Sequence, residues 1–401
     1  MTTAYKGFDV DLQCRGFQFE VGKTYTHDGP VEPCNSGFHA CENPMDVWTY
    51  YPIIQDNGTL TRYAEVEVAG EISRKGDKLA AKQIAIKSEL SLSDFVRRAA
   101  AAIIDSTAGK AESGAYAKIG ASGDYVQIGA SGDGTRIGAS GDAAQIGASG
   151  DGAKIGASGK GAKIGASGKA AKIGSSGDYG KIGASGDYAQ IGASGHNVQI
   201  GASGKGAKIG ASGYGAQIGA SGDSAKIGTS GDNAKIGAIG KGAKIGSSGD
   251  NVQIVASGKG GKIGASGDGA KIGASGDNFQ IGASGHNVQI EASGDGAKIG
   301  TSGKFARIGS SGDGAKIWAS GDYAQIVASG DYAKIDCSGL DAVVAGAGPN
   351  ARVRGKLGTW ISLASFDMDG KCNGFGTGCI GQDGLEPDTW YRAEAGKLVK
   401  A

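Results

Sequence analysis

The sequence predicts a mainly β protein built around a right-handed β-solenoid of nine-residue repeats, with two repeats in each coil. Isoleucine occupies every ninth position from Ile119 to Ile335, 25 times without an insertion, and Val344 and Val353 continue the frame. Such a strict short period is typical of stacked coils that bury their apolar sides against one another. We place the solenoid at residues 110–354.

A single repeat explains why strands are expected. In residues 125–133, Val126, Ile128 and Ala130 are two apart, so they share one face of an extended strand. Ser-Gly-Asp follows, which is turn sequence. A helix is disfavoured, because two glycines per repeat would cost it about 2 kcal/mol. Each repeat therefore predicts one strand and one corner, with isoleucine stacked inside.

The residue before each isoleucine predicts two unlike faces. It is Lys or Arg in 11 of 13 odd-numbered repeats, but in only 5 of 12 even-numbered repeats, where the others carry Gln. The alternation favours a coil of 18 residues with one basic and one amide-rich face. The basic residues that we expect to bind a partner are Lys154, Lys172, Lys208, Lys226, Lys244 and Lys262.

Three segments flank the solenoid. Residues 1–90 hold most of the aromatic residues and predict an α+β domain, with strands at 16–21 and 62–68. Residues 91–109 predict a helix that Ser91 or Ser93 caps, followed by a lead-in to the repeats. We expect its apolar stripe to plug the open end of the solenoid. Residues 355–401 predict a small β-rich cap, with strands at 360–366 and 389–392.

Two resemblances follow from short motifs. The runs Tyr5-Lys6-Gly7-Phe8-Asp9, Cys14-Arg15-Gly16-Phe17-Gln18 and Gly37-Phe38-His39-Ala40-Cys41, with Tyr50-Tyr51, resemble an uncharacterised domain of phage and prophage proteins. The resemblance implies a phage or mobile-element origin and brings no catalytic residues. The repeat superficially resembles the nonapeptide of calcium-binding β-rolls, but its Asp directly follows Gly.

Composition limits the classes of partner and compartment. The 401 residues include 78 glycines and carry a net charge of +1, so no overall field favours nucleic acid or a membrane. No apolar run is long enough to span a bilayer. Six cysteines without a secretory signal indicate reduced thiols in a cytoplasm.

We expect no metal and no cofactor. Lysine replaces the corner Asp at 160, 169, 205, 241, 259 and 304, which argues against calcium. Cys14, Cys34, His39 and Cys41 lack the usual zinc spacing, so buried structural side chains are the more economical interpretation. His196 and His286 lie five coils apart, about 24 Å, and cannot share a ligand.

We also expect no enzyme activity. The repeated serines lack a positioned base, and no phosphate-binding loop is present. The weak alternatives are polar residues of the N-terminal domain, namely Asp9, Asp11, His27, His39 and Glu42.

The glycine after each isoleucine points outward and makes a flat strip. Val255, Glu291, Trp318, Val327 and Asp336 interrupt it. The terminal domain covers Trp318, Val255 and Val327, or these residues anchor a partner. The function we expect is a rigid interaction surface of a phage-encoded protein in a bacterial cytoplasm, which inhibits or sequesters a host factor. The alternatives are a self-associating or virion scaffold and a nucleic-acid binder using the lysine-rich face.

Overall fold

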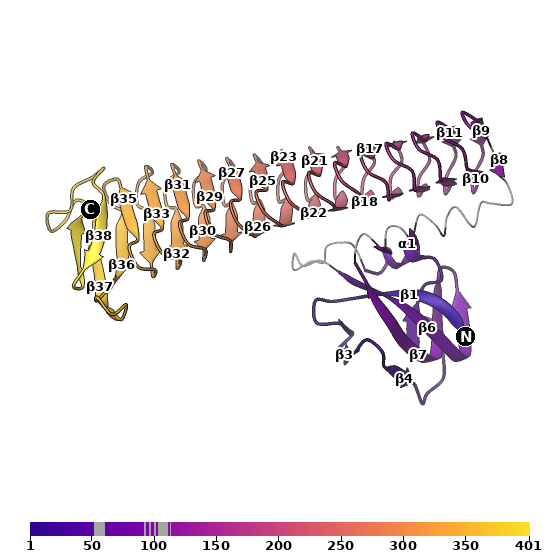
Figure 1. Ribbon diagram of the computed structural model, residues 1–401, viewed down its shortest axis with the longest axis horizontal. Coiled ribbons are helices and arrows are strands. Elements are labelled where there is room, and N and C mark those ends of the chain that lie inside the picture. Colours follow the sequence, from indigo (N-terminus) through magenta and orange to yellow (C-terminus); the bar gives the residue numbers. More distant parts are fainter. Residues whose placement is uncertain (52–60, 92–93, 96–97, 100–101, 103–110, 113) are drawn as a thin grey trace. The chain divides into compact units, whose positions relative to one another are not determined.

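The computed structural model describes residues 1–401 except 52–60, 92–93, 96–97, 100–101, 103–110 and 113. The chain forms two compact units, Met1–Ile227 with Ala234–Ala238 and Gly228–Asn233 with Ile239–Ala401. Both units contain solenoid coils built from the same repeat. The first also contains an N-terminal sheet domain, and the second contains the C-terminal strands (Figure 1).

The N-terminal domain is an antiparallel sheet with the strand order β1-β6-β7-β4, in which β5 also pairs with β7. Its elements are β1 (Thr2–Phe8), β2 (Gln13–Cys14), β3 (Phe17–Gln18), β4 (Thr24–Thr26), β5 (Phe38–Ala40), α1 (Pro44–Val47), β6 (Arg62–Lys75) and β7 (Lys78–Leu90). Alternate residues of β6 and β7 are buried together with Phe8 and Phe19. The predicted strand at 62–68 is confirmed as part of β6, whereas the one at 16–21 shortens to β3.

The segment after β7 packs differently from our expectation. Ser91 caps it as predicted, because its hydroxyl accepts the N–H of Asp94 at 3.1 Å. Phe95, however, stacks on Tyr63 with 4.0 Å between ring centroids, and Ala99 is buried in the same cluster. These apolar side chains therefore complete the core of the N-terminal domain and do not plug the solenoid. Much of the predicted helix lies outside the described residues.

The solenoid consists of two parallel sheets whose strands alternate along the chain. The first sheet contains β9 (Lys118–Ser122), β11 (Arg136–Ser140), β13 (Lys154–Ala157), β15 (Lys172–Ser175), β17 (Gln190–Ala193), β19 (Lys208–Ala211), β21 (Lys226–Thr229), β23 (Lys244–Ser247), β25 (Lys262–Ala265), β27 (Gln280–Ala283), β29 (Lys298–Thr301), β31 (Lys316–Ala319), β33 (Lys334–Cys337) and β35 (Arg352–Gly355). The second contains β8 (Ala111–Glu112), β10 (Gln127–Ala130), β12 (Gln145–Ala148), β14 (Lys163–Ala166), β16 (Lys181–Ala184), β18 (Gln199–Ser203), β20 (Gln217–Ser221), β22 (Lys235–Ile239), β24 (Gln253–Ser257), β26 (Lys271–Ser275), β28 (Gln289–Ala292), β30 (Arg307–Ser310), β32 (Gln325–Ala328) and β34 (Val343–Gly346).

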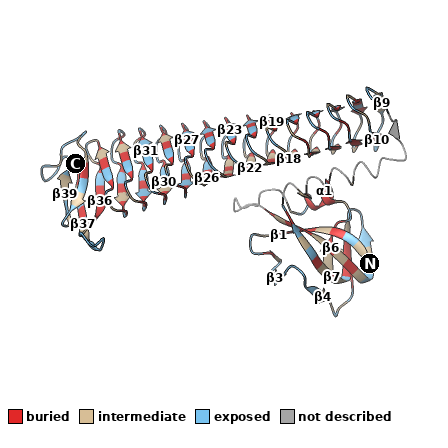
Figure 2. Ribbon diagram, viewed as in Figure 1, coloured by how far each residue is buried: buried red, intermediate tan, exposed pale blue. Residues whose placement is uncertain are grey.

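The strand register confirms two repeats per coil. Ile137 pairs with Ile155, and Ile128 with Ile146, so each residue lies beside the equivalent residue one coil later. Isoleucine and the residues two positions before and after it, most of them alanine, are buried (Figure 2). Burial of one isoleucine contributes roughly 1.5–3 kcal/mol. A ladder of these side chains, repeated coil after coil, stabilises the stack.

Corner glycines are needed for close stacking. A Cβ built on Gly267 would lie 2.0 Å from the carbonyl oxygen of Gly249, its equivalent one coil earlier. By contrast, a Cβ on the strand residue Gly264 meets nothing within 4 Å. The two glycines of a repeat therefore differ in purpose, since only the corner glycine permits the approach of two backbones.

Corner aspartates also hold neighbouring coils together. The carboxylate of Asp142 accepts the backbone N–H of Lys160, 18 residues later, at 2.8 Å. Asp250 and Asp268 continue the same pattern on another pair of coils. We name this series of bonds the aspartate ladder. It satisfies corner N–H groups that lack a strand partner.

The C-terminal strands continue both sheets before they end them. β36 (Trp360–Phe366), which matches the predicted strand, pairs in parallel with β34 and antiparallel with β37 (Cys372–Cys379). β38 (Tyr391–Glu394) pairs antiparallel with β35 and with β39 (Lys397–Lys400). Antiparallel strands thus occupy the last edge of each sheet.

Candidate functional site

The two sheets present different outward residues. We call the outer side of the sheet from β9 to β35 the lysine face, and the outer side of the sheet from β8 to β34 the glutamine face. All six predicted lysines lie on the lysine face, at the first position of β13, β15, β19, β21, β23 and β25. Lys154 pairs with Lys172, and Lys244 with Lys262, on neighbouring strands whose backbones lie about 4.8 Å apart.

No ion pair joins any of these six lysines to another residue within the described part of the chain. The corner aspartates keep their negative charge while they accept backbone N–H groups in the ladder, so they weaken the repulsion between these lysines without pairing with them. A column of ammonium groups that form no ion pair among the described residues favours an anionic partner.

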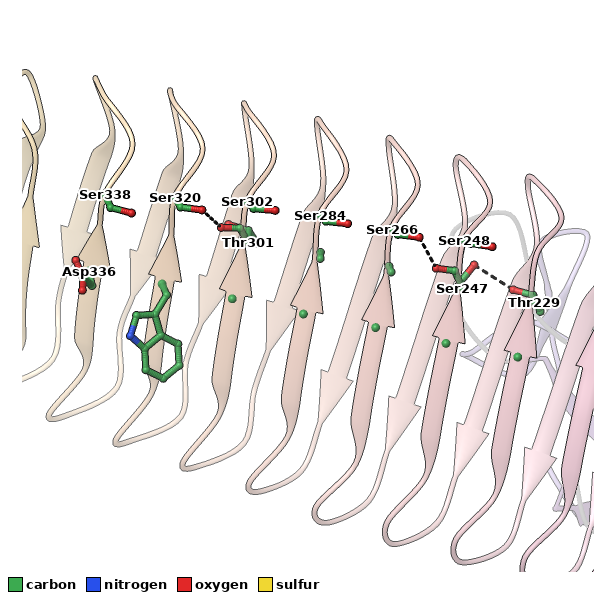
Figure 3. A pocket seen from close by; sticks show the side chains of 18 residues that line it. Thr229, Ser247, Ser248, Ser266, Ser284, Thr301, Ser302, Ser320, Asp336 and Ser338 are labelled. Atoms are coloured by element: carbon green, nitrogen blue, oxygen red, sulfur yellow. Dashed lines mark hydrogen bonds between the residues drawn. The ribbon is translucent and has the colours of Figure 1, made fainter.

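A shallow groove of about 780 Å³ runs across β21 to β33 on the lysine face. Its floor is the outward glycine column, whose members include Gly246, Gly264 and Gly282. One side is a column of serine hydroxyls, which Figure 3 shows side by side from Ser248 to Ser338. On most of these strands a lysine lies two residues before the glycine, as Lys244 and Lys262 do, whereas Gln280 has this position before Gly282. The groove therefore exposes backbone and hydroxyl groups beside a row of cations.

Trp318 interrupts the glycine column of this groove. It lies on β31 between Gly300 and Asp336 of the adjacent strands, and 46% of its surface is exposed. The strands before β31 in this groove carry glycine at the same position, whereas the next strand carries Asp336, which Figure 3 labels. Asp336 is paired with Arg354. The indole thus remains available to a partner, and the C-terminal strands do not cover it.

Val255 and Val327 lie on the opposite, glutamine face. They border a second groove of about 490 Å³ and share its outward column with Gly273, Glu291 and Gly309. Val327 is 56% exposed, whereas Val255 is half-buried. The structure therefore does not bring the three predicted anchors together, because Trp318 belongs to the lysine face.

The predicted polar candidates of the N-terminal domain are dispersed. Asp9 accepts the N–H groups of Asp11 and Gln13 in a turn, and Glu42 is paired with Arg74 at 2.8 Å. The Nε2 atom of His39 accepts the N–H of Cys34 at 2.9 Å. These contacts stabilise local turns and strand ends.

Histidines at the corners have a structural role. Nδ1 of His196 accepts the N–H of Tyr214 at 3.2 Å, and Nδ1 of His286 accepts that of Lys304 at 3.1 Å. Each histidine therefore replaces a corner aspartate in its ladder. Among the residues that the structure describes, no group of three or more His, Cys, Asp or Glu is placed to hold a metal ion.

Two features escaped the sequence reasoning. One is the aspartate ladder. The other is the stacked pair Phe305 and Tyr323, exposed at one corner with ring centroids 5.2 Å apart. Both residues have positive φ, at 60° and 61°, in the slot that follows the corner residue. Their 18-residue separation would have indicated the contact once the coil length was known.

Comparison with known proteins identifies only the N-terminal domain. Residues 2–98 match the model of a family described as a domain of unknown function (DUF7666). No curated protein and no solved structure gives a significant match to the chain. Helices long and apolar enough to cross a bilayer do not occur in the described ranges.

Proposed function

We propose that the chain is a non-enzymatic, phage-encoded repeat protein whose lysine face is a rigid protein–protein interaction surface in the cytoplasm of a bacterial host. The partner is a host or phage protein with an acidic ridge, which the protein sequesters or inhibits. The observation that supports this proposal is the column of lysines without ion pairs among the described residues, beside a glycine-floored groove that contains an exposed tryptophan.

Each part of the groove contributes a different quality to recognition. The lysine column attracts acidic side chains and speeds association. The glycine floor lets a ridge approach the backbone closely, and the serine hydroxyls supply donors and acceptors. Trp318 supplies the large apolar contact that dominates most protein interfaces. Because successive strands are hydrogen-bonded in register, the surface is pre-organised and little conformational entropy is lost on binding.

Nucleic-acid binding and self-association would use the same lysine face, and the experiment below distinguishes them from binding of a protein partner. A nucleic-acid binder would need stacking platforms, whereas Trp318 is the one aromatic residue lining this groove among the described residues. A self-associating scaffold would bring acidic groups of a second copy against the lysines. Glu291 on the glutamine face is one such group.

The experiment measures binding of a fluorescent ten-residue glutamate peptide and of a single-stranded oligonucleotide by anisotropy. The variant Lys244→Glu/Lys262→Glu reverses two charges of the column. Lys271→Glu on β26 of the glutamine face is the matched control. An exposed ion pair contributes about 0.2–1 kcal/mol, so we expect peptide affinity to fall by about 2- to 30-fold in the double variant only.

Lysate capture extends the test to the natural partner. A host protein that binds after nuclease treatment, is lost with Lys244→Glu/Lys262→Glu and is retained with Lys271→Glu supports the proposal. Trp318→Gly restores the glycine column, so it should preserve the fold and weaken capture by about 30-fold or more. Preference for the oligonucleotide, or concentration-dependent oligomers as the sole interaction, would reject it.

A further inference from the structure

The N-terminal domain encloses a cavity of about 180 Å³ that is separate from the solenoid surfaces. Residues of β1, β2, β5, α1 and β7 contribute to its wall, together with the turn that follows α1. The lining consists of Tyr5, Lys6, Gly7, Cys14, Arg15, His39, Ala40, Cys41, Val47, Tyr50, Tyr51 and Lys78. None of these residues is an aspartate or glutamate, whereas three of them are cationic.

Lys6 is the most unusual member of this set, because only 5% of its surface is exposed. Its ammonium group donates to the carbonyl oxygen of His39 at 3.0 Å and to the sulfur of Cys14 at 3.4 Å. The rings of Phe8 and Phe19 lie 5.6 Å away. An ammonium group has three donors, so one N–H of Lys6 remains beyond these two bonds among the residues that the structure describes. A buried cation without a carboxylate partner is costly.

Burial lowers the pKa of Lys6 and the charge of Lys78 adds to this shift, whereas the thiols of Cys14 and Cys41 oppose it. Arg15 and Lys78 add further positive charge to the same wall. The pKa of His39 is lowered first by burial and then by these three cations. Two acids lie near this wall and both have partners: Asp77 accepts the hydroxyl of Tyr50 at 2.6 Å, and Asp46 is paired with Lys163 at 2.7 Å.

The cavity is shaped by a glycine and a tyrosine. A Cβ on Gly7 would lie 2.4 Å from the Cβ and Cγ atoms of Tyr51, so only glycine lets this ring lie against β1. The hydroxyl of Tyr51 is 2.7 Å from the sulfur of Cys14. Polar hydrogen-bonding groups therefore converge beside Lys6, and Tyr51 closes that part of the wall.

We propose that this cavity binds a small oxyanion, a phosphate or a carboxylate, through Lys6, Arg15 and Lys78. Such an anion supplies the negative charge that the lining lacks and accepts the remaining N–H of Lys6. A volume of 180 Å³ corresponds to about six water molecules, so a single phosphate or a small organic acid fits, but a nucleotide does not. The site is independent of the interaction surface proposed above.

The first experiment titrates the full-length chain with inorganic phosphate and, separately, with malonate by isothermal calorimetry. We expect saturable binding of one anion per chain, weakened at least tenfold by Lys6→Met and by Lys78→Met. Lys87→Met is the matched control, because Lys87 lies on β7 as Lys78 does but pairs with Glu67 at the surface. Comparison of the affinities for phosphate and malonate shows whether the cavity binds a phosphate or a carboxylate.

A second measurement needs no variant and holds even if Lys6→Met does not fold. Iodoacetamide labelling is mapped by mass spectrometry with and without the anion that binds. We expect the anion to slow labelling of Cys14 at least threefold and to leave that of the exposed Cys34 unchanged. Absence of saturable binding of both anions, or full binding in Lys6→Met and Lys78→Met, would overturn the proposal.

Discussion

Replacement of one corner glycine should destabilise the solenoid far more than replacement of a strand glycine in the same repeat. The perturbation is Gly267→Ala, and its control is Gly264→Ala. In the first variant the new methyl carbon lies 2.0 Å from the oxygen and 2.4 Å from the carbon of the Gly249 carbonyl. Neither atom belongs to a flexible side chain, so two coils must separate for the methyl group to fit.

The expected loss in the free energy of unfolding follows from the hydrogen bonds that this separation breaks. An ordinary contact of this kind requires more than 3.4 Å, so the corner must open by over 1 Å. The bonds that join these coils nearby include Asp268 N–H to the carboxylate of Asp250 and Asn251 N–H to the carbonyl of Asp268. Loss of two such bonds, at about 1 kcal/mol each, adds to an overpacking cost of about 1–3 kcal/mol. We expect a loss of about 3–5 kcal/mol in the free energy of unfolding.

Gly264→Ala should be neutral or stabilising by about 0.5–1 kcal/mol, because alanine loses less entropy than glycine in a strand. Urea denaturation measures both variants. Native-state hydrogen exchange at β23 and β25 locates the effect, since a long repeat array need not unfold in one step. Equal stability of the two variants would refute the inference that corner glycines serve close backbone stacking.

Three further predictions concern the ladder and the thiols. Asp268→Ala should lower the free energy of unfolding by about 1 kcal/mol, while Asp268→Asn, which keeps an acceptor for the N–H of His286, should lose less than half of that in the same urea assay. The pKa of Asp322 is lowered because its carboxylate accepts the N–H of Leu340 and, secondarily, pairs with Lys304. A carboxylate whose folded-state pKa is lowered stabilises the fold above its unfolded-state pKa, and this contribution is lost as the pH falls through the folded-state value. Unfolding midpoints should therefore decline below about pH 4, and less steeply in Asp322→Asn. Burial raises the pKa of Cys41 and of Cys337 to about 12, so at pH 8 iodoacetamide should modify the exposed Cys372 at least tenfold faster than either, as measured by peptide mass spectrometry.

Most of the solenoid could be predicted from the sequence, because one residue type recurs at the same position of every repeat. The nine-residue spacing of isoleucine located the strands, and the alternation of Lys154 with Gln145 indicated two faces. Trp360–Phe366 was recognised as a strand by its own apolar residues. In these cases a local pattern carried the structural information.

Long-range packing explains where prediction failed. The sequence places Phe95 in the apolar stripe of a helix, but it does not show what that stripe contacts. In the fold, Phe95 stacks on Tyr63 and does not pack against the first coil. Trp318 and Val327 occupy the same slot of the repeat, and their separation onto opposite faces depends on the parity of the coil. The acceptor role of Asp268 depends on a neighbour 18 residues away. The convergence of Lys6 with Cys14 depends on the pairing of short strands that have no period.

The 18-residue register has a consequence for how such a gene can change. Nearly identical repeats favour unequal recombination, which removes or duplicates segments of coding sequence. Loss of one full coil leaves every later strand on its own face and only shortens the groove. Loss of a single nine-residue repeat would transfer all later lysines to the other face and break the column at that point. The proposed use of the lysine face therefore predicts length variation in steps of two repeats and not in steps of one.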